Sequence, residues 1–365
     1  SEVKGSEGAV INLETEGEVN GNLDSYAPKY ITNEKKGILR KYQSYSGITG
    51  EDNGATELLF INKGTVNLLS EKSNYIFVTS HTNGGLRTNY IDNEGSIFAK
   101  GKESVIIKHT PDTGEAKAWI YSNSANGKMY ADGEGSLVMG WAYHNLGSGR
   151  AAFVNDGTVQ VRGKKAIGIF MADDNELDRY GSTKNATMAP GSSVYLTKAM
   201  DLLGDESIGW VSQNTGIDGD TKNLVQFNIG KEAQIAEIGN SLTEATKTEK
   251  AIGILQDHEK KTNAATVIEI GEHTKESMGI YARQGEMNVI SPLANMGIAS
   301  SKLDIQGGTG NIGMVATSSE QVERVKDEYG TIIGSNPITA KAKINFEGEA
   351  LITGGENHKL ALATA

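Results

Sequence analysis

The chain has 365 residues, a formal net charge of −11 and no cysteine. The lack of cysteine excludes disulfides and Cys-based zinc or nucleophile chemistry. The net negative charge and the lack of a continuous Lys/Arg stripe make nucleic acid a poor candidate partner. No stretch approaches the roughly 18 apolar residues of a membrane-spanning helix, so no transmembrane segment is expected in this sequence.

The first recurring phrase along the chain is Asn-x-Gly-[Thr/Ser]-apolar-x-apolar, at residues 62–68, 93–99 and 155–161. The first two copies start 31 residues apart, and the third starts twice that distance further on. Asn-x-Gly favours a turn because both residues tolerate positive φ, and the alternation after it is typical of a half-buried strand. One structural unit is therefore about 31 residues long.

A second phrase places a glycine between two large apolar residues. It occurs seven times, where chance would give roughly one copy, at residues 139–141, 167–169, 208–210, 252–254, 278–280, 296–298 and 312–314. We expect the residues that flank these glycines to be interior, with Trp141 and Trp210 in the same role. The predicted core consists of Ile167, Ile169, Ile208, Ile252, Ile254, Met278, Ile280 and Ile312.

Units of this size cannot bury an apolar face alone, and repeat sequences normally solve this by stacking. With short strands and little helix-forming sequence, the chain predicts an all-β fold, a right-handed parallel β-helix (solenoid) of about 12 to 15 coils. A β-sandwich needs no internal repeat. Propeller blades repeat at about 40–50 residues, and the last glycine phrases lie only 18 and 16 residues apart.

We expect one continuous solenoid with four stretches. Residues 1–54 are less regular early coils, 55–316 the core repeats with excursions, 317–337 a helical excursion and 338–365 the final coils. Ser318–Gln321 resembles a capping box, and Val322 and Val325 follow three residues apart, which predicts a short helix over 319–329. The start at Ser1, without a methionine, suggests a piece cut from a longer polypeptide.

Polar excursions from the rod are expected at 81–92, 109–131, 173–190, 213–226 and 240–265. Exposed aromatic and arginine side chains anchor partners, so the candidate binding residues are Trp119, Tyr121, Tyr130, Arg179 and Tyr180. Asp218 and Asp220 form a short alternating acidic run and a weak Ca²⁺ candidate, because Lys222 takes the next alternate position and opposes a cation.

The sequence gives little support for catalysis. Gly-x-Ser-x-Gly does not occur, the six histidines lack metal-ligand spacing, and no carboxylates recur on the outward positions of consecutive strands. Asp173, Asp174 and Asp178 lie near Arg179 but are more typical of a polar turn. We therefore expect no enzyme, no cofactor and no catalytic residue.

Several of these phrases resemble those of the large type V autotransporters of fusobacteria. The resemblance rests on 155–161, on Ile-Gly-Ile-Phe-Met-Ala at 167–172, on 62–68 and 93–99, and on Ser-Met-Gly-Ile-Tyr-Ala at 277–282, and it covers about residues 55–316. It implies a passenger rod that reaches outward from a C-terminal barrel in a Gram-negative outer membrane. Such proteins are adhesins that act in coaggregation, host-cell adhesion and virulence.

The expected function is a monomeric, surface-exposed passenger segment that binds a host-cell receptor protein, a glycan or a surface protein of another bacterium. The excursions at 109–131, 173–190 and 317–337 would provide recognition, because loops leave a solenoid without disturbing its stacked strands. Two alternatives remain open: a β-helical polysaccharide lyase or glycoside hydrolase, and a purely structural stalk.

Overall fold

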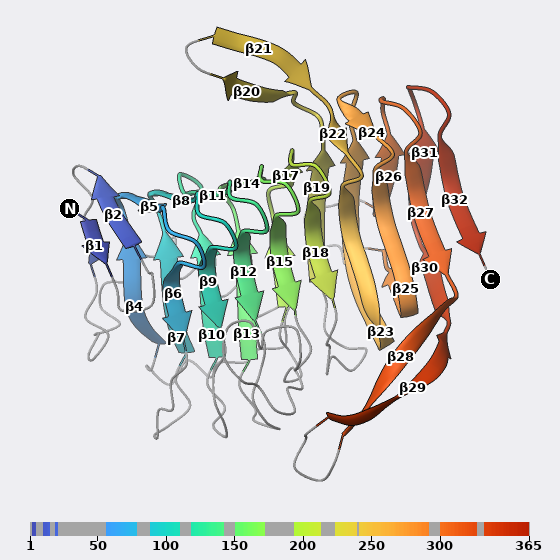
Figure 1. Cartoon of the computed structure of the whole chain (residues 1–365), viewed down its shortest axis with the longest axis horizontal. Helices are drawn as coiled ribbons and strands as arrows, with labels where there is room; N and C mark the ends of the chain where they lie inside the picture. The colour runs from blue at the N-terminus through green and yellow to red at the C-terminus, as the bar shows by residue number, and fades with distance from the viewer. Residues whose placement is uncertain are drawn as a thin grey trace.

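Stacked β-strands make up the architecture. The computed structural model describes residues 2–4, 10–14, 19–20, 56–78, 88–109, 118–141, 150–171, 193–212, 223–238, 241–291, 300–326 and 332–364. Every regular element within these residues is a β-strand. The strands follow one another along the long axis of the molecule from the N-terminal to the C-terminal end (Figure 1).

A turn of the chain consists of three strands that pair in parallel with the equivalent strands of the next turn. For example, β10 (Ala118–Asn123), β11 (Lys128–Ala131) and β12 (Leu137–Trp141) pair with β13 (Arg150–Asn155), β14 (Thr158–Val161) and β15 (Ile167–Met171). The register places Tyr121 beside Phe153 and Met129 beside Val159, so like positions stack along the rod. This confirms the parallel β-helix.

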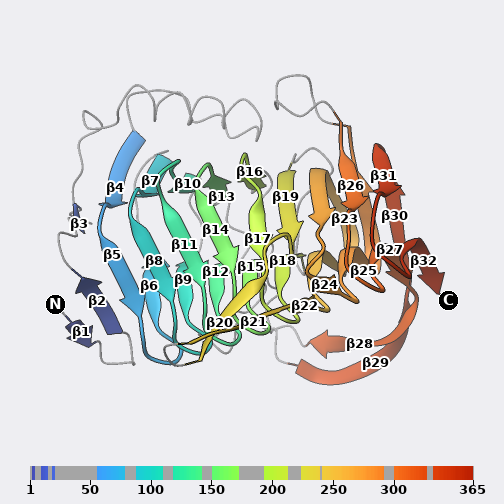
Figure 2. The same cartoon turned by 90° about the horizontal axis from the view of Figure 1, so that it is seen from above.

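Three sheets run along the rod, and Figure 2 shows the first and second side by side. The first sheet contains β4 (Thr56–Asn62), β7 (Thr88–Asn93), β10, β13, β16 (Ser193–Leu196), the start of β19 (Asn223–Ile229), the middle of β23 (Ile252–Ile270), the end of β25 (Met278–Val289) and β30 (Ala342–Phe346). The second contains β5 (Thr65–Leu68), β8 (Ser96–Ala99), β11, β14, β17 (Met200–Leu202), the ends of β19 and β23, β26 (Lys302–Ile305) and β31 (Glu349–Ile352).

The third sheet allows the turns to be counted. It contains β6 (Asn74–Val78), β9 (Val105–His109), β12, β15, β18 (Ile208–Ser212), the starts of β23 (Ile252–Ile270) and β25 (Met278–Val289), β27 (Ile312–Thr317) and β32 (Lys359–Thr364). These nine strands mark nine described turns, fewer than the 12 to 15 predicted. Two hairpins between the strands, at residues 234–246 and 319–340, account for further described residues.

The N-terminal side of the rod departs from the parallel pattern. Strand β1 (Glu2–Lys4) pairs antiparallel with β2 (Val10–Glu14), and β2 pairs antiparallel with β5 of the first complete turn. Strand β3 (Val19–Asn20) pairs antiparallel with β4. The described part of the stretch predicted as early coils is therefore an antiparallel border on the rod.

Two hairpins leave the rod at different corners. One consists of β20 (Gln234–Ile238) and β21 (Ser241–Thr246) and lies between the second and third sheets, next to β22 (Thr248–Glu249), which pairs with β24 (Thr274–Lys275). The other consists of β28 (Ser319–Lys326) and β29 (Ile332–Ala340) and lies between the third and first sheets. Both hairpins project from the stacked turns in Figure 1.

The predicted helix over 319–329 is wrong, because residues 319–326 form β28. Its capping box and the spacing of Val322 and Val325 are local signals, whereas the strand is fixed by pairing with β29 from Ser319 opposite Ala340 onward. Strand β29 carries the β-branched residues Ile332, Ile333 and Ile338, which favour a strand. Tertiary pairing overrides a weak helix propensity here.

In four copies of the phrase, only one of the two residues that flank the glycine lies in the interior. The residues after the glycine, Ile169, Trp210, Ile254 and Ile280, are fully buried in the core, as predicted. The residues before it are half-buried and lie outside the core, which corrects the prediction for Ile167, Ile208, Ile252, Met278 and Ile312.

The glycine itself explains the difference. A Cβ on Gly209 would overlap the ring of the core residue Phe227 and lie 2.6 Å from the carbonyl oxygen of Gly253, so this glycine faces the interior. Gly168 faces Met200 in the same way. The glycine and the residue after it both point inward, so the strand bends there and the period-two alternation used in the prediction fails.

One described copy of the phrase does not join this column. The register places Met139 beside Ile169 and Gly140 beside Phe170, so this copy is shifted by two residues. The fully buried Val138 stands at the glycine position instead. The copy at 296–298 and the side chain of Trp141 lie outside the described residues.

A ladder of asparagines runs through the first four turns at the Asn-x-Gly phrase. Asn62, Asn93, Asn123 and Asn155 are buried, and each amide donates to the next amide oxygen at 2.8, 2.8 and 2.9 Å. The glycines of the phrase are not needed for positive φ, since Gly95 and Gly157 do not adopt it. A Cβ on Gly95 would lie 2.7 Å from the Lys63 carbonyl carbon, so close stacking of the turns requires the glycine.

Candidate functional site

A column of outward-facing side chains runs along the second sheet, at the middle residue of each apolar-x-apolar strand. Its inner neighbours are core residues; Val159 and Val161, for example, are fully buried. Because strand side chains alternate between faces, the middle residue points away from the core. In register, the column consists of Phe98, Tyr130, Gln160, Asp201, Asn228, Glu269 and Asp304.

The N-terminal part of the column is an aromatic and cationic stack. The rings of Phe98 and Tyr130 stack with centroids 4.7 Å apart, and the Arg162 guanidinium lies 4.3 Å from the Tyr130 centroid. Arg162 donates two hydrogen bonds to Asp132, at 2.6 and 2.8 Å. Among the predicted binding residues whose side chains are described, Tyr130 is thus the one found on the outer surface, but Phe98 and Arg162 already contact its ring.

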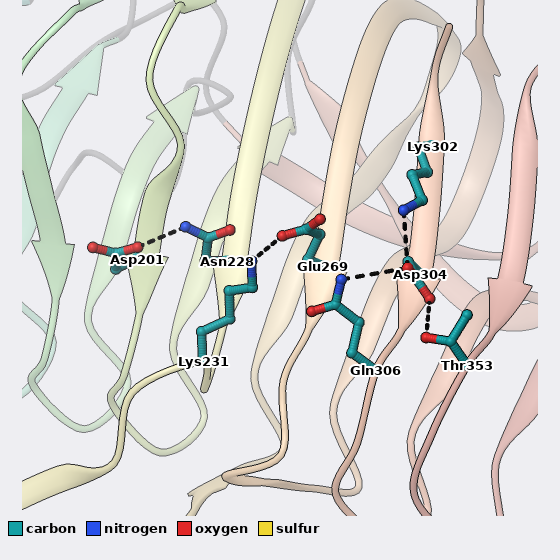
Figure 3. Close-up of polar contacts among 8 residues, drawn as sticks. All are labelled: Asp201, Asn228, Lys231, Glu269, Lys302, Asp304, Gln306 and Thr353. Carbon is teal, nitrogen blue, oxygen red and sulfur yellow. Dashed lines mark hydrogen bonds and ion pairs between the residues drawn. The ribbon is translucent and has the colours of Figure 1, made fainter.

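The C-terminal part of the column is a row of carboxylates and amides (Figure 3). Asn228 Nδ2 donates to Asp201 Oδ1 at 2.9 Å, and Gln160 Nε2 approaches Asp201 Oδ2 at 3.5 Å. Lys231, just beyond the end of β19, forms an ion pair with Glu269 on the next turn. Each of these two carboxylates therefore has an amide or an ammonium group as its partner.

Asp304 is the most enclosed carboxylate of the row. It is buried, and it accepts hydrogen bonds from Lys302 Nζ at 2.9 Å, Thr353 Oγ1 at 2.8 Å and Gln306 Nε2 at 3.3 Å. Burial raises the pKa of Asp304, but these hydrogen bonds and the Lys302 charge outweigh burial, so the pKa lies below its usual value. Asp304 is ionised at neutral pH.

Glu269 and Asp304 are register partners on adjacent turns, an arrangement that inspection of the sequence for aligned carboxylates missed. The signal was present, because both residues occupy the middle of an apolar-x-apolar triplet. A glycosidase uses such a pair when one carboxyl group stays protonated to act as the acid. The pKa of Asp304 moves in the opposite direction, so the pair is better suited to accepting hydrogen bonds than to acid catalysis.

Besides Tyr130 in β11, the structure places two more predicted binding residues in a regular strand. Residues 109–131 were expected to form an excursion, but they contain β10 and β11, and only 110–117 lie outside the described residues. Tyr121 is fully buried, with its hydroxyl 2.5 Å from His109 Nδ1, so it cannot contact a partner. Trp119 lies in the same strand, beside Asn89 and Ala151 in the register. Alternating aromatic and apolar residues there form a strand of the repeat.

His109 is enclosed with Tyr121 inside the rod. Its side chain is completely buried, and burial lowers the pKa of His109 from 6.5 to about 3. The imidazole is therefore neutral at physiological pH. Its hydrogen bond with Tyr121 links the end of β9 to β10 across residues 110–117.

The remaining candidates lie outside the described residues: Arg179, Tyr180, Asp218 and Asp220, with Asp173, Asp174 and Asp178. The excursion predicted at 213–226 is shortened at its end, since β19 begins at Asn223. Within the described ranges, no group of three His, Asp or Glu side chains is placed to hold a metal ion.

The corner between the third and first sheets, here called the insertion corner, receives most of the extra chain. Residues 79–87, 110–117, 142–149, 172–192 and 213–222 all leave the end of a third-sheet strand and return at the next first-sheet strand. The β28–β29 hairpin occupies the same corner between β27 and β30. Insertions of unequal length thus start from one line along the rod.

No family model, curated protein or solved structure matches the chain. Among the residues that the structure describes, no helix is long and apolar enough to cross a bilayer.

Proposed function

We propose that this chain is a segment of a bacterial surface adhesin that binds host-cell receptors or partner bacteria through insertions on a β-helical rod. The observation that carries the proposal is the insertion corner. The strands repeat with constant register, while the chain between β15 and β16 is much longer than that between β9 and β10. A rigid scaffold with variable loops on one line is typical of a recognition surface.

The place of the segment in the cell is part of the same proposal. The phrases at 62–68, 155–161 and 277–282 resemble the passengers of fusobacterial type V autotransporters, which supports export to the outer-membrane surface. In that setting the rod provides reach, and the receptor is a protein, a glycan or a surface protein of another bacterium.

The test removes one hairpin at each of two corners. The first variant replaces the β28–β29 hairpin by a short turn between Ser318 and Lys341, whose neighbouring backbone bonds to Thr364 and Gly285 anchor the ends. The matched control removes β20–β21 from the other corner. Binding of the fluorescently labelled chain to epithelial cells and to partner bacteria is measured by flow cytometry, with circular dichroism as a check of folding.

We expect removal of β28–β29, or shortening of another insertion at the same corner, to abolish binding, and removal of β20–β21 to leave it unchanged. A folded chain that binds no cell type tested would contradict the proposal and favour a structural stalk. If only removal of β20–β21 abolished binding, recognition would lie at the corner between the second and third sheets, which would contradict the role of the insertion corner.

A second candidate is a carbohydrate-active enzyme: Glu269 and Asp304 are aligned on adjacent turns, and the lowered pKa of Asp304 leaves it the role of a carboxylate base or nucleophile but not of the acid. Incubation with a panel of acidic polysaccharides, followed by assays for new reducing or unsaturated ends, separates the two functions. Product formation that disappears with Glu269→Gln would favour the enzyme.

A further inference from the structure

The outer face of the third sheet is apolar, in contrast to the polar row on the second sheet. In β15, β18, β23, β25 and β27 the residue before the glycine points outward, and Leu137 of β12 takes the equivalent position in the register. All but the first are half-buried. The column consists of Leu137, Ile167, Ile208, Ile252, Met278 and Ile312.

A second apolar column lies three residues further along the same strands. It points outward because the residues on both sides of it face the interior, as Trp210 and Ser212 do around Val211. Its other members are Phe170, Leu255, Tyr281 and Val315. Val211, Leu255 and Val315 are buried within the chain itself, so only the half-buried Phe170 and Tyr281 add to the surface that the first column offers. No described strand lies over this face, which is turned toward the viewer in Figure 1. An apolar surface with a polar rim typically marks an interaction site.

The rim of this face is a row of charges with alternating sign. At the corner before each third-sheet strand, one residue adopts positive φ, and the backbone of each such turn donates to the next turn. Beside the apolar column these residues are Gly135, Lys165, Glu206, Lys250, Glu276 and Gly310. The row therefore consists of two lysines and two glutamates in alternation, with a glycine at each end.

When this row of charges is turned end to end and laid against itself, each lysine lies opposite a glutamate. A two-fold axis parallel to the strands, passing between the turns of Glu206 and Lys250, reverses the order of turns in a second copy. Lys165 then faces Glu276 of the second copy, and Glu206 faces its Lys250. The apolar column matches in the same way, with Ile208 facing Ile252 of the second copy.

We propose that two copies of this chain associate through this face as a closed, antiparallel, two-fold dimer. The two-fold arrangement uses the same surface on both copies and leaves no open site for a third. The apolar column is only about 24 Å long, five strand spacings of about 4.8 Å. We therefore expect the area buried in the dimer to be smaller than that of a standard protein interface. The dimer is therefore weak and forms as concentration rises, in place of the monomer expected from the sequence.

The first test measures the mass of the chain by sedimentation equilibrium over increasing concentration. We expect it to rise from 38.9 kDa toward twice that value. Ile252→Lys, at the centre of the face, should keep the chain monomeric while its circular dichroism and melting temperature stay close to those of the unaltered chain. A monomer at every concentration overturns the proposal, as does a filament or a dimer that Ile252→Lys leaves intact.

A charge-reversal series tests the geometry without altering the apolar column. Glu206→Lys places like charges together at two symmetric points and should weaken the dimer about tenfold. Glu206→Lys combined with Lys250→Glu should restore it, although the ion pairs of Glu206 with Lys164 and Lys165 of its own chain stay broken.

The matched control is Glu103→Lys, which lies in the same positive-φ column but outside the apolar face. In the dimer its opposite residue is the uncharged Asn357 of the second copy, so we expect no change in association. Failure of the double reversal to restore a dimer, or equal weakening by Glu103→Lys, contradicts the antiparallel arrangement.

Discussion

The interior and the outer surface of this rod are made by the same strands under different constraints. Inside, Gly168, Gly209 and Gly253 face side chains or backbone that leave no room for a Cβ, and the buried amides bond from turn to turn. Outside, one column of the second sheet changes from aromatic to amide to carboxylate between Tyr130 and Asp304 without a change in register. Inward positions therefore specify the fold, and outward positions are free to specialise.

The largest loss of stability at neutral pH is expected from a slightly larger side chain in the interior. Gly209→Ala would push a methyl group against the Phe227 ring and the Gly253 carbonyl, and overpacking of this kind costs about 3 kcal/mol of unfolding free energy. Gly140→Ala is the matched control, because its Cβ would meet only Leu137 Cδ2 at 3.3 Å. Urea denaturation compares the two, and equal effects would break the contrast between the glycine column and the shifted copy.

The asparagine ladder should be the next most sensitive feature. Asn123→Ala removes the acceptor for Asn93 and the donor for Asn155, and buried polar groups that lose a partner cost about 2 kcal/mol. Asn126→Ala, on the exposed side of the same turn, should cost almost nothing. Similar denaturation midpoints for both variants would show that the ladder does not hold the turns together.

Buried His109 should make the interior sensitive to acid. The unfolded chain takes up a proton below about pH 6.5, whereas the folded chain resists protonation until about pH 3. Stability should therefore be unaffected above pH 6.5 and fall by up to about 1.4 kcal/mol per pH unit between those values. The measurement is denaturation against pH for the unaltered chain and for His109→Gln, and parallel curves would contradict the assignment.

Substitutions in the outward-facing row of carboxylates and amides on the second sheet should change the stability least. Asp304→Asn keeps the shape but loses the charge that Lys302 contacts, at a cost of about 1 kcal/mol near pH 7. Because the pKa of Asp304 is lowered by folding, this contribution is present above the unfolded value of about 3.9 and is lost as pH falls through the folded value. The difference between the two chains should disappear in acid.

The exposed pair of Lys231 and Glu269 provides the lower limit of the series. Lys231→Met should change the unfolding free energy by about 0.5 kcal/mol or less, because solvent-exposed ion pairs contribute little. Thermal melts at low and high salt measure it. A loss as large as that for Asn123→Ala would remove the distinction between interior and surface.

The sequence was sufficient for the architecture because it repeats. The phrases at 62–68 and 93–99 are register partners in β5 and β8, and the core position after each glycine follows from the second phrase. The position before the glycine could not be predicted from alternation, since the bend at residues such as Gly168 depends on contact with Met200 from another sheet. The strand β28 could not be predicted for the same reason. Its conformation depends on pairing with β29, which lies further along the chain than the local sequence signals that indicated a helix.

The candidate site was harder to predict than the fold. The outer row could have been found by aligning the middle residues of the apolar triplets, from Gln160 to Asp304, but its ion pairs come from residues at other positions, such as Lys231. Treating 109–131 as one excursion failed because an aromatic residue in a strand and one in a loop look alike in sequence. Only its burial showed that Tyr121 is interior.

Strands β23 and β25 pass the insertion corner without a break, so two successive turns carry only short bulges there. Arg283 and Asp257 pair across this bare stretch at 3.4 Å. Because each turn depends only on its neighbours, these two sites are natural positions for grafting. A foreign epitope inserted after Arg283 would be displayed beside the existing hairpin, which makes the rod a ready carrier for new binding specificities.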